Sequence, residues 1–549
     1  MKTRKWGFTL ALVLLAVLIV SPLCIVLLHS FYPDDTFDIT APFRTMFDGE
    51  LSEVFFNSIQ LGFMVVLGAT VLALPMVFLM TKTSLGRHKW LDVVLIIPFM
   101  TPPYIGSMGW ILFMQKRGFL EQMVPFTEKI TPFFFSLFGM VTIMSLHLFP
   151  FLYLILRNAL AKIGNNLEEA GQVYGGTFMY RFRKIIIPLL LSSYGMGALL
   201  VMVKTIAEFG TPATFGRLIG YHVLTSEIHK YTSSWPIDFA RATALASILL
   251  SACLLFWYVQ NVMSRKFQYQ TITGKGSRQK TVQFKGWKRV LSWGYVVFLL
   301  GTSIGVPYFS IVVSSLQKLR GEGLAWGNFT FAHYAELLSF GSPGLQALTN
   351  SLGLAFIAAS IAAILGTFLA LQIGKGKKWT ERVTDAFSLL PNTVPGIVIV
   401  VGLILLWNAS WMPIPIYNTY AMVALTYVVF YVPYTVQYVK ASLGQINVSL
   451  TNAANVFGGT PWYTFRRVVL PLIIPGVLAG WTMTFTISVR ELVASLMVLP
   501  PSMEVSATYI FTQFEQGSVS LGMAMAVVSV GLTTIVLLVM NQLFQQEKG

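Results

Sequence analysis

A stretch of 23 residues occurs twice in this chain. The first copy, Glu168–Leu190, reads EEAGQVYGGTFMYRFRKIIIPLL, and the second, Thr451–Ile473, reads TNAANVFGGTPWYTFRRVVLPLI. Ten aligned positions are identical, namely Ala170/Ala453, Val173/Val456, Gly175/Gly458, Gly176/Gly459, Thr177/Thr460, Tyr180/Tyr463, Phe182/Phe465, Arg183/Arg466, Pro188/Pro471 and Leu189/Leu472. Each copy is polar, ends in basic residues and precedes a long apolar run. The repeat therefore indicates a duplicated protein that uses the same loop once in each half.

The local chemistry of the loop predicts two short helices separated by a glycine turn. Paired glycines at the centre of each copy permit a left-handed residue at the end of the first helix. In the second copy, Thr460 suits a helix N-cap and Pro461 suits the first helical position. For a single copy, an ordinary amphipathic connector is an equally good interpretation. The occurrence of two copies in equivalent places favours a shared function.

The rest of the chain is dominated by apolar runs. Apolar residues make up 55% of the 549 residues and charged residues only 11%, a composition typical of an all-α polytopic membrane protein. Runs long enough to cross the hydrocarbon predict about twelve transmembrane helices. We expect these near residues 8–28, 56–80, 91–114, 133–156, 185–206, 242–263, 290–314, 350–373, 386–408, 420–439, 471–489 and 519–543.

The charges predict the orientation of these spans. With the N-terminus inside, most of the 38 Lys and Arg residues fall on the inner side and most acids fall outside, as the positive-inside rule requires. Both termini and both copies of the loop are then cytoplasmic. The N-terminal run resembles a secretory signal, but it lacks a small-residue cleavage site and is interpreted as a retained first span. Topology explains the net charge of +16, so nucleic acid is not an expected partner.

The duplication extends beyond the loop and predicts two halves with the same order and orientation of spans. We expect an N-terminal half at residues 1–263, a basic, flexible cytoplasmic linker at 264–289 and a C-terminal half at 290–549. The further matches are Asn57-Ser58 with Asn350-Ser351, Pro98 and Pro102 with Pro391 and Pro395, and Glu208 with Glu491.

Four charged residues near the outer ends of spans are candidates for a translocation gate: Lys204, Glu208, Arg490 and Glu491. Charge at membrane depth is costly, so such side chains usually face protein or a watery cavity. The simpler interpretation is that they pair and fix the mouth of the pathway, with Lys204 and Glu208 four residues apart on one helix face. The alternative is that Glu208 and Glu491 line the gate and offer oxygen ligands to a cation. No metal site is assigned, because the histidines and cysteines show no ligand spacing.

The repeated loop resembles the EAA loop of binding-protein-dependent ABC importer permeases, EAA-x3-G-x9-I-x-L-P. The first copy has Glu169, Ala170, Gly171 and Gly175 at the matching positions, and the second has Asn452, Ala453, Ala454 and Gly458. The resemblance covers about 54–263 and 346–543, which implies two fused six-helix MetI-like permease domains. Asn452 in place of an acid and Gly171 in place of alanine depart from the pattern, which makes unequal contacts an expectation.

The resemblance implies the partners and the mechanism. Each loop would contact one of two copies of a separate ATPase subunit, through the eight residues named above. A solute-binding protein would deliver cargo from outside, and the two halves would alternate access across a prokaryotic cytoplasmic membrane. No GxxxxGK[ST] phosphate loop is present, so ATP is expected on the partner and no cofactor on this chain. The chain is therefore expected to be a transport subunit and not an enzyme.

Cargo is not encoded in the spans. Two permease domains in one chain of this length most resemble the ferric-iron permease family, and similar fused permeases serve thiamine and 2-aminoethylphosphonate. A major-facilitator secondary carrier is a distant alternative, because it also has twelve spans and a basic central loop. That class has no counterpart of the repeated loop.

Overall fold

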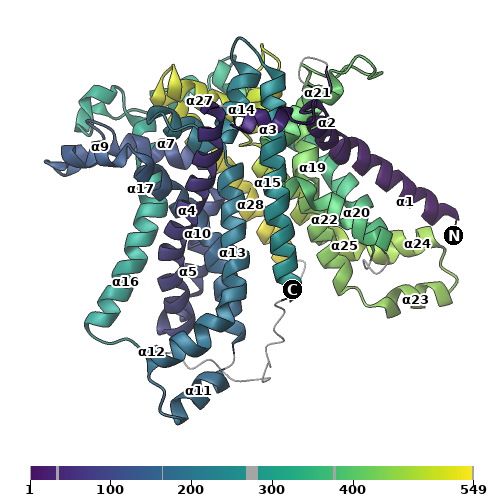
Figure 1. Cartoon of the computed structure of the whole chain (residues 1–549), viewed down its shortest axis with the longest axis horizontal. Helices are drawn as coiled ribbons and strands as arrows, with labels where there is room; N and C mark the ends of the chain where they lie inside the picture. The colour runs from purple at the N-terminus through teal and green to yellow at the C-terminus, as the bar shows by residue number, and fades with distance from the viewer. Residues whose placement is uncertain are drawn as a thin grey trace. The chain divides into compact units, whose positions relative to one another are not determined.

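The computed structural model describes residues 2–32, 36–47, 49–163, 165–266, 282–374 and 379–546, which are almost entirely helical (Figure 1). The chain forms two compact units, and each is built from separate segments. Unit 1 contains Met1–Thr45, Ile228–Leu250 and Phe329–Gly549, and unit 2 contains Met46–Glu227 and Ser251–Asn328.

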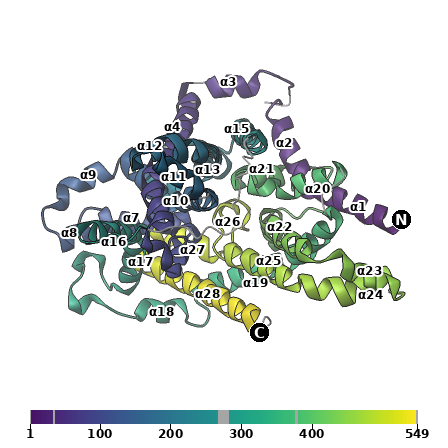
Figure 2. The same ribbon diagram turned by 90° about the horizontal axis from the view of Figure 1, so that it is seen from below.

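Unit 2 is built on three long helices that pack against one another: α4 (Gly49–Lys82), α10 (Leu137–Lys162) and α13 (Ile187–Ala207). Shorter helices complete it, namely α5 (Lys89–Val94), α6 (Ile97–Met100), α7 (Pro103–Met114), α8 (Phe119–Met123), α9 (Ile130–Phe134), α11 (Asn165–Val173), α12 (Phe178–Arg181), α16 (Trp287–Leu300) and α17 (Val306–Leu316). Figures 1 and 2 show α11 and α12 at one end of α10 and α13.

Unit 1 repeats this core with α19 (Pro343–Ile373), α22 (Tyr420–Gln445) and α25 (Leu470–Ser488), which again pack mutually. The other helices that lie wholly within unit 1 are α1 (Lys2–Leu15), α2 (Ser21–His29), α18 (Ala332–Leu337), α20 (Trp379–Leu389), α21 (Gly396–Trp407), α23 (Val448–Val456), α24 (Pro461–Thr464), α26 (Val493–Val498), α27 (Ser506–Glu515) and α28 (Val519–Gln546). Three helices cross the division between the units: α3 (Ala41–Phe47), α14 (Leu224–Ser233) and α15 (Phe239–Lys266).

The all-α polytopic fold is confirmed, with a correction to two spans. In the described ranges, ten helices are long and apolar enough to cross a membrane, and two bent pairs raise the number to twelve if each pair is one span. The third and ninth spans, which the sequence predicts as continuous, are these pairs. Lys89–Met100 meets Pro103–Met114 at 91°, and Trp379–Asn392 meets Gly396–Trp407 at 104°.

The repeated prolines explain both bends. Pro102 is the N-cap of α7 and Pro395 is the N-cap of α21, with ψ angles of 132° and 135°. Proline lacks an N–H and disfavours a helical residue before it, so the helix stops and restarts in a new direction. The matched prolines are therefore the sequence signal for a broken span.

Contacts within unit 2 show that the bent pair runs from one end of the core to the other. Asp92 on α5 bonds Arg157 near the end of α10, where the chain enters the repeated loop. On α7, Ser107 accepts a hydrogen bond of 2.9 Å from Thr214, which follows the far end of α13. Because α13 leads away from the loop, the two contacts lie at opposite ends of the core. The pair therefore crosses as one broken span.

The first span of each sequence half packs in the unit dominated by the other half. In unit 1, α1 contacts α19 and α20, and α2 packs along α21 (Figure 1). In unit 2, α17 packs along α7 and α16 contacts α4. The compact units thus differ from the sequence halves 1–263 and 290–549 by an exchange of first spans and by the placement of Ile228–Leu250 in unit 1.

A glycine facing a proline marks each of these exchanged contacts. A Cβ on Gly109 of α7 would lie 2.7 Å from the Pro307 carbonyl oxygen, and one on Gly402 of α21 would lie 2.3 Å from that of Pro22. Both distances are far below van der Waals contact, so only glycine lets the backbones approach this closely. Small residues are used in this way at helix interfaces within membranes.

The repeated Asn-Ser pairs cap distant helices. Ser58 Oγ accepts a hydrogen bond from the Leu224 N–H at 2.9 Å, and Ser351 Oγ accepts one from the Ser506 N–H at 2.7 Å. Leu224 and Ser506 begin α14 and α27, whose first N–H groups have no partner inside the helix. The pairs therefore fix the matched outer helices to the core.

The end of the predicted linker is docked on the core. Residues 267–281 lie outside the described ranges, but Val282 donates to the Lys82 carbonyl oxygen at 2.9 Å and accepts from the Ser84 N–H at 3.1 Å. The segment 282–286 therefore straps the turn after α4, although the sequence predicts a flexible connector throughout.

We expect Gly109→Ala to lower the stability of the protein by about 1–3 kcal/mol, because the added methyl overpacks the contact with Pro307. Gly106→Ala is the matched control on the same helix, because a Cβ there meets nothing within 4 Å. Thermal unfolding in detergent should give a lower midpoint for Gly109→Ala alone. Equal midpoints for the two variants would contradict the close packing.

Candidate functional site

Both copies of the repeated loop fold as predicted, as two short helices around a glycine turn. In the first copy, Gly175 has φ +78° and the Gly176 N–H donates to the Gly171 carbonyl oxygen at 2.8 Å. In the second copy, Gly458 has φ +79° and the Gly459 N–H donates to the Ala454 carbonyl oxygen, also at 2.8 Å. This six-to-one bond with a left-handed glycine is the Schellman ending of a helix.

Threonine caps the second helix of each loop. Thr460 Oγ1 accepts from the Tyr463 N–H at 3.2 Å with Pro461 in the first helical turn, which confirms the predicted cap. Thr177 Oγ1 accepts from the Tyr180 N–H at 3.3 Å in the first copy. The two loops therefore have the same backbone, although their sequences match at fewer than half of the positions.

The first helix of each loop presents apolar side chains at its exposed end. Tyr174 is 91% exposed and its counterpart Phe457 is 90% exposed, and Val173 and Val456 beside them are also exposed. Exposed aromatic residues on a rigid element are typical of a docking surface. This exposed apolar surface supports the prediction that the loops contact a partner.

The eight residues predicted to contact an ATPase lie on these helices and turns. Glu169, Ala170, Gly175, Asn452, Ala453 and Gly458 are exposed, and Gly171 and Ala454 are half-buried. A Cβ on Gly171 would lie 3.0 Å from Ile185 Cδ1 and 3.1 Å from Arg181 Cγ, which explains glycine where the second copy has alanine. Their contact with a partner stays a prediction.

Sequence reasoning missed a pair of matched ion pairs beside the loops. In unit 2, Arg157 bonds both carboxylate oxygens of Asp92, with Nη2 to Oδ2 at 2.8 Å, and Tyr153 donates to the same carboxylate at 3.3 Å. In unit 1, Lys440 bonds Asp385. Each pair joins the first arm of the broken span to the helix that enters the repeated loop.

The repeat itself contained a signal for these pairs. Arg157 and Lys440 stand twelve residues before Glu169 and Asn452, and Asp92 and Asp385 stand six residues before Pro98 and Pro391. Charges of opposite sign at fixed offsets from two repeated motifs predict a contact if those motifs are neighbours. Only the fold shows that they are.

A single helical segment connects each loop to a glutamate at the other end of the core. The spans Met179–Ala207 and Pro461–Ser488 begin within the loops and end just before Glu208 and Glu491. Glu208 accepts from the Thr211 N–H at 3.0 Å, and Glu491 accepts from the Ala494 N–H at 3.2 Å. Burial raises the pKa of Glu208 to about 7 and also raises the pKa of Glu491.

The two glutamates are matched in backbone role. Thr225 Oγ1 donates to the Glu208 carbonyl oxygen at 2.8 Å, and Ser495 Oγ donates to the Glu491 carbonyl oxygen at 2.6 Å. In both cases the carboxylate accepts an N–H three residues later, as a capping side chain does at the start of a helical turn. The predicted equivalence of Glu208 and Glu491 thus has a structural basis within each unit.

Their side-chain surroundings differ. Tyr431 donates a hydrogen bond to the Glu491 carboxylate, and Tyr427 bonds Ser495 at 2.7 Å. At the positions aligned with Tyr427 and Tyr431, the first half has Met144 and Leu148. The second glutamate is therefore held by a tyrosine that the first one lacks.

The structure does not show the pairing of Lys204 with Glu208 that the sequence suggested, and it places Arg490 against its own helix. Helix α13 ends at Ala207 and the backbone of Glu208 is extended, with ψ 135°. Glu208 therefore does not lie on the same helix face as Lys204. No ion pair joins them in the described ranges. Arg490 Nε donates to the carbonyl oxygen of Thr486, four residues earlier in the chain, at 3.2 Å.

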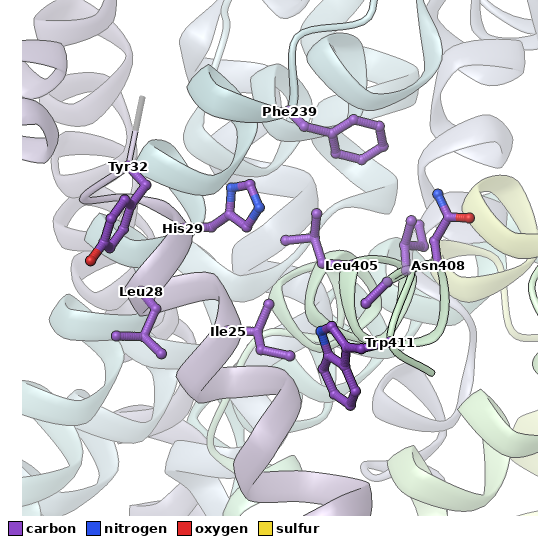
Figure 3. Close-up of a pocket in the computed structure, with 10 residues that line it drawn as sticks. Ile25, Leu28, His29, Tyr32, Phe239, Leu405, Asn408 and Trp411 are labelled. Atoms are coloured by element: carbon purple, nitrogen blue, oxygen red, sulfur yellow. The ribbon is translucent and has the colours of Figure 1, made fainter. Parts of the chain in front are cut away.

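A separate cavity of about 560 Å³ lies in unit 1 and contains none of the gate candidates. Ile25 and His29 on α2 face Leu405 and Trp411, with Phe239 above them (Figure 3). Its lining is mostly apolar and carries no acidic side chain. Across the described residues, no group of three or more His, Cys, Asp or Glu is placed to hold a metal ion.

Comparison with known proteins agrees with the duplicated architecture. Residues 86–269 and 362–548 each match the family described as binding-protein-dependent transport system inner membrane component. These matches cover more than half of the chain and include both repeated loops. The chain belongs to this family of transport permeases, and the distant secondary-carrier alternative is not supported.

Among the relatives are ferric permeases that match over most of the chain. The ferric transport system permease protein FbpB of Actinobacillus pleuropneumoniae is 26% identical, over 94% of this chain and 75% of that protein. The Fe(3+)-transport system permease protein FbpB 2 of Haemophilus influenzae is 26% identical over 89% of each chain. The 2-aminoethylphosphonate transport system permease protein PhnV of Salmonella typhi is 26% identical over 43% of this chain and 89% of its own length. The two-domain, ferric-permease-like organisation predicted from the sequence is thus confirmed.

We expect Asp92→Asn to cost about 2 kcal/mol of stability, because it leaves the half-buried Arg157 without its bidentate partner. The double variant with Arg157→Gln should recover part of that loss, and thermal unfolding of the four proteins in a double-mutant cycle measures the coupling. Asp238→Asn is the control, because the Asp238–Arg241 pair is more exposed and is expected to contribute less than about 1 kcal/mol. Independent, additive effects at Asp92 and Arg157 would refute the pairing.

Proposed function

We propose that this chain is the membrane-spanning subunit of an ATP-driven importer that carries ferric iron into the cytoplasm. An extracytoplasmic solute-binding protein delivers the cargo, and two copies of a separate ATPase bind the repeated loops on the cytoplasmic side. ATP stays on those partners, and this chain holds no cofactor and is not an enzyme. Both termini are cytoplasmic in a prokaryotic inner membrane.

The observation that supports this proposal best is the repeated loop. Two loops share a Schellman turn and a threonine cap, and both expose an aromatic residue, Tyr174 or Phe457, at the same place. Two docking elements of the same backbone fold on one chain fit a partner that acts as a dimer. Family membership supports the same class of partner.

The fold suggests how movement at the loops reaches the pathway. The helix that starts in each loop continues through the core to Glu208 or Glu491, and a packed helix moves as a rigid element. The Asp92–Arg157 and Asp385–Lys440 pairs tie the broken span to the helix before each loop. Closure of the ATPase pair would then displace the loop, the broken span and the glutamate together, which gives alternating access.

Ferric iron is the cargo that the relatives favour. Both ferric permeases align with about nine-tenths of this chain (94% and 89%), whereas the 2-aminoethylphosphonate permease aligns with only 43% of this chain. Glu208 and Glu491 supply carboxylate oxygens, which suit a hard cation. Uptake of 2-aminoethylphosphonate is the second candidate, and thiamine follows from the sequence resemblance alone.

Transport in proteoliposomes tests the ATPase contact. Ala170→Arg with Ala453→Arg places a bulky charge on each exposed loop helix, and we expect uptake and ATPase co-purification to fall about tenfold or more. Trp326→Arg is the control. Trp326 is 97% exposed, and it lies in the loop between the predicted spans 290–314 and 350–373, which is expected on the other side of the membrane. Uptake that proceeds without ATP or the ATPase would overturn the proposal.

The role of the glutamates is tested by Glu208→Gln combined with Glu491→Gln. We expect iron uptake to drop about tenfold or more, because the amides cannot supply the charge that a cation requires. The same protein should still bind the ATPase and should unfold within a few degrees of the wild type. Wild-type uptake by a correctly assembled double variant would remove both residues from the pathway.

A further inference from the structure

A polar cavity of about 380 Å³ lies in unit 2 beneath the strap 282–286. Its walls come from the turn after α4, from the strap and from the first turns of α16. Hydroxyl groups (Thr83, Ser84 and Ser292), two cations (Lys285 and Arg289) and the imidazole of His88 share the lining. We propose that this cavity binds the headgroup of an anionic phospholipid.

The charge of the cavity is of one sign. Lys285 and Arg289 line it, and none of its described lining residues is acidic. The closest acid in sequence, Asp92, is already bonded to Arg157. A phosphodiester is therefore the complementary ligand, with Lys285 and Arg289 meeting its charge and the Ser84 hydroxyl donating a hydrogen bond, since the Thr83 and Ser292 hydroxyls already donate to the Leu79 and Lys288 carbonyl oxygens.

The cavity stands at the level where several spans end. The span Leu51–Lys82 stops one residue before its wall, and the spans starting at Lys89 and Trp287 begin beside it. Trp90 and Trp287 are exposed at the same level, as expected of aromatic residues at a membrane interface. The positive-inside orientation places this level at the cytoplasmic leaflet.

Helix α16, whose first turns line the cavity, carries an exposed apolar face on its other side. Val290 and Leu291, which directly follow the lining residue Arg289, are exposed, and Val297 and Phe298 repeat this exposed apolar face two turns on. This face differs from the one that carries Arg289, Ser292 and Trp293, and it places α16 at the edge of the protein against lipid. The cavity therefore lies where lipid headgroups are found, which is why the proposed ligand is a phospholipid and not a soluble phosphate.

The strap fixes the walls of the cavity in place. Backbone hydrogen bonds hold Val282 to Lys82 and Ser84, and the rings of His88 and Trp293 meet edge to face at 5.4 Å across the wall. A bound lipid would join the turn after α4, the end of the linker and the exchanged first span of the second sequence half. The lipid would then stabilise the packing of that exchanged span.

Native mass spectrometry of the full-length, delipidated protein tests the site, with dioleoyl phosphatidylglycerol and dioleoyl phosphatidylcholine as probes. We expect preferential binding of phosphatidylglycerol, weakened about 30-fold by Lys285→Gln with Arg289→Gln, because each basic residue near an anionic lipid contributes roughly fivefold. The charge-preserving variant Lys285→Arg with Arg289→Lys should retain binding. Unfolding midpoints in lipid-free detergent establish that each variant is folded.

Lys89→Gln with Lys288→Gln is the matched control, because it removes two charges at the same membrane level from residues that do not line the cavity. We expect it to change phosphatidylglycerol affinity less than about threefold. An equal loss in the control would mean diffuse attraction to a basic surface and would overturn the proposal. Equal binding of phosphatidylcholine would also overturn it, as would inorganic phosphate or glycerol phosphate competing as strongly as the lipid.

Discussion

Backbone hydrogen bonding in the membrane is the constraint on which this structure depends. Hydrocarbon offers no partner to a free N–H or C=O, so a span can be interrupted only where protein supplies one. Both repeated prolines interrupt a span, and the surrounding residues satisfy the exposed groups. Thr101 Oγ1 donates to the Ile97 carbonyl oxygen at 3.2 Å beside the first break, and the Val394 N–H donates to the Leu390 carbonyl oxygen at 3.0 Å at the second. The breaks then determine which helix faces meet the exchanged first spans.

The two sequence halves share a framework and differ in the chemistry placed on it. Matched glycine–proline contacts, serine caps, ion pairs and Schellman turns recur at equivalent positions, which shows that duplication preserved the backbone. Side chains diverge in the loops and beside the glutamates: Gly171 aligns with Ala454, Glu169 aligns with Asn452, and Tyr431 holds only the second glutamate. Two contacts with identical partners would therefore differ in strength, and so would the resistance of the two glutamates to movement.

Continuity of the long helices relates these features to transport. A loop that exposes aromatic side chains continues directly into a core helix, and that helix ends at a glutamate held by backbone N–H groups. The ion pairs beside the loops connect the broken span to the helix before each loop, α10 or α22, and the exchanged first spans pack on the broken spans. In the proposed mechanism, a force applied at the loop acts on a rigid assembly, because close packing in the core leaves little room for a local response.

Hydropathy and repetition determined much of this protein from sequence alone. They predicted an all-α polytopic fold with about twelve spans, and the glycines and threonines of the loop predicted its turn and caps, because these signals are local. Tertiary structure decided what depends on distant contacts. The 91° and 104° bends, the docked end of the linker and the exchange of first spans arise from packing between segments far apart in sequence. Likewise, Asp92 and Arg157 carry no local sign of pairing, and only the fold brings their charges together.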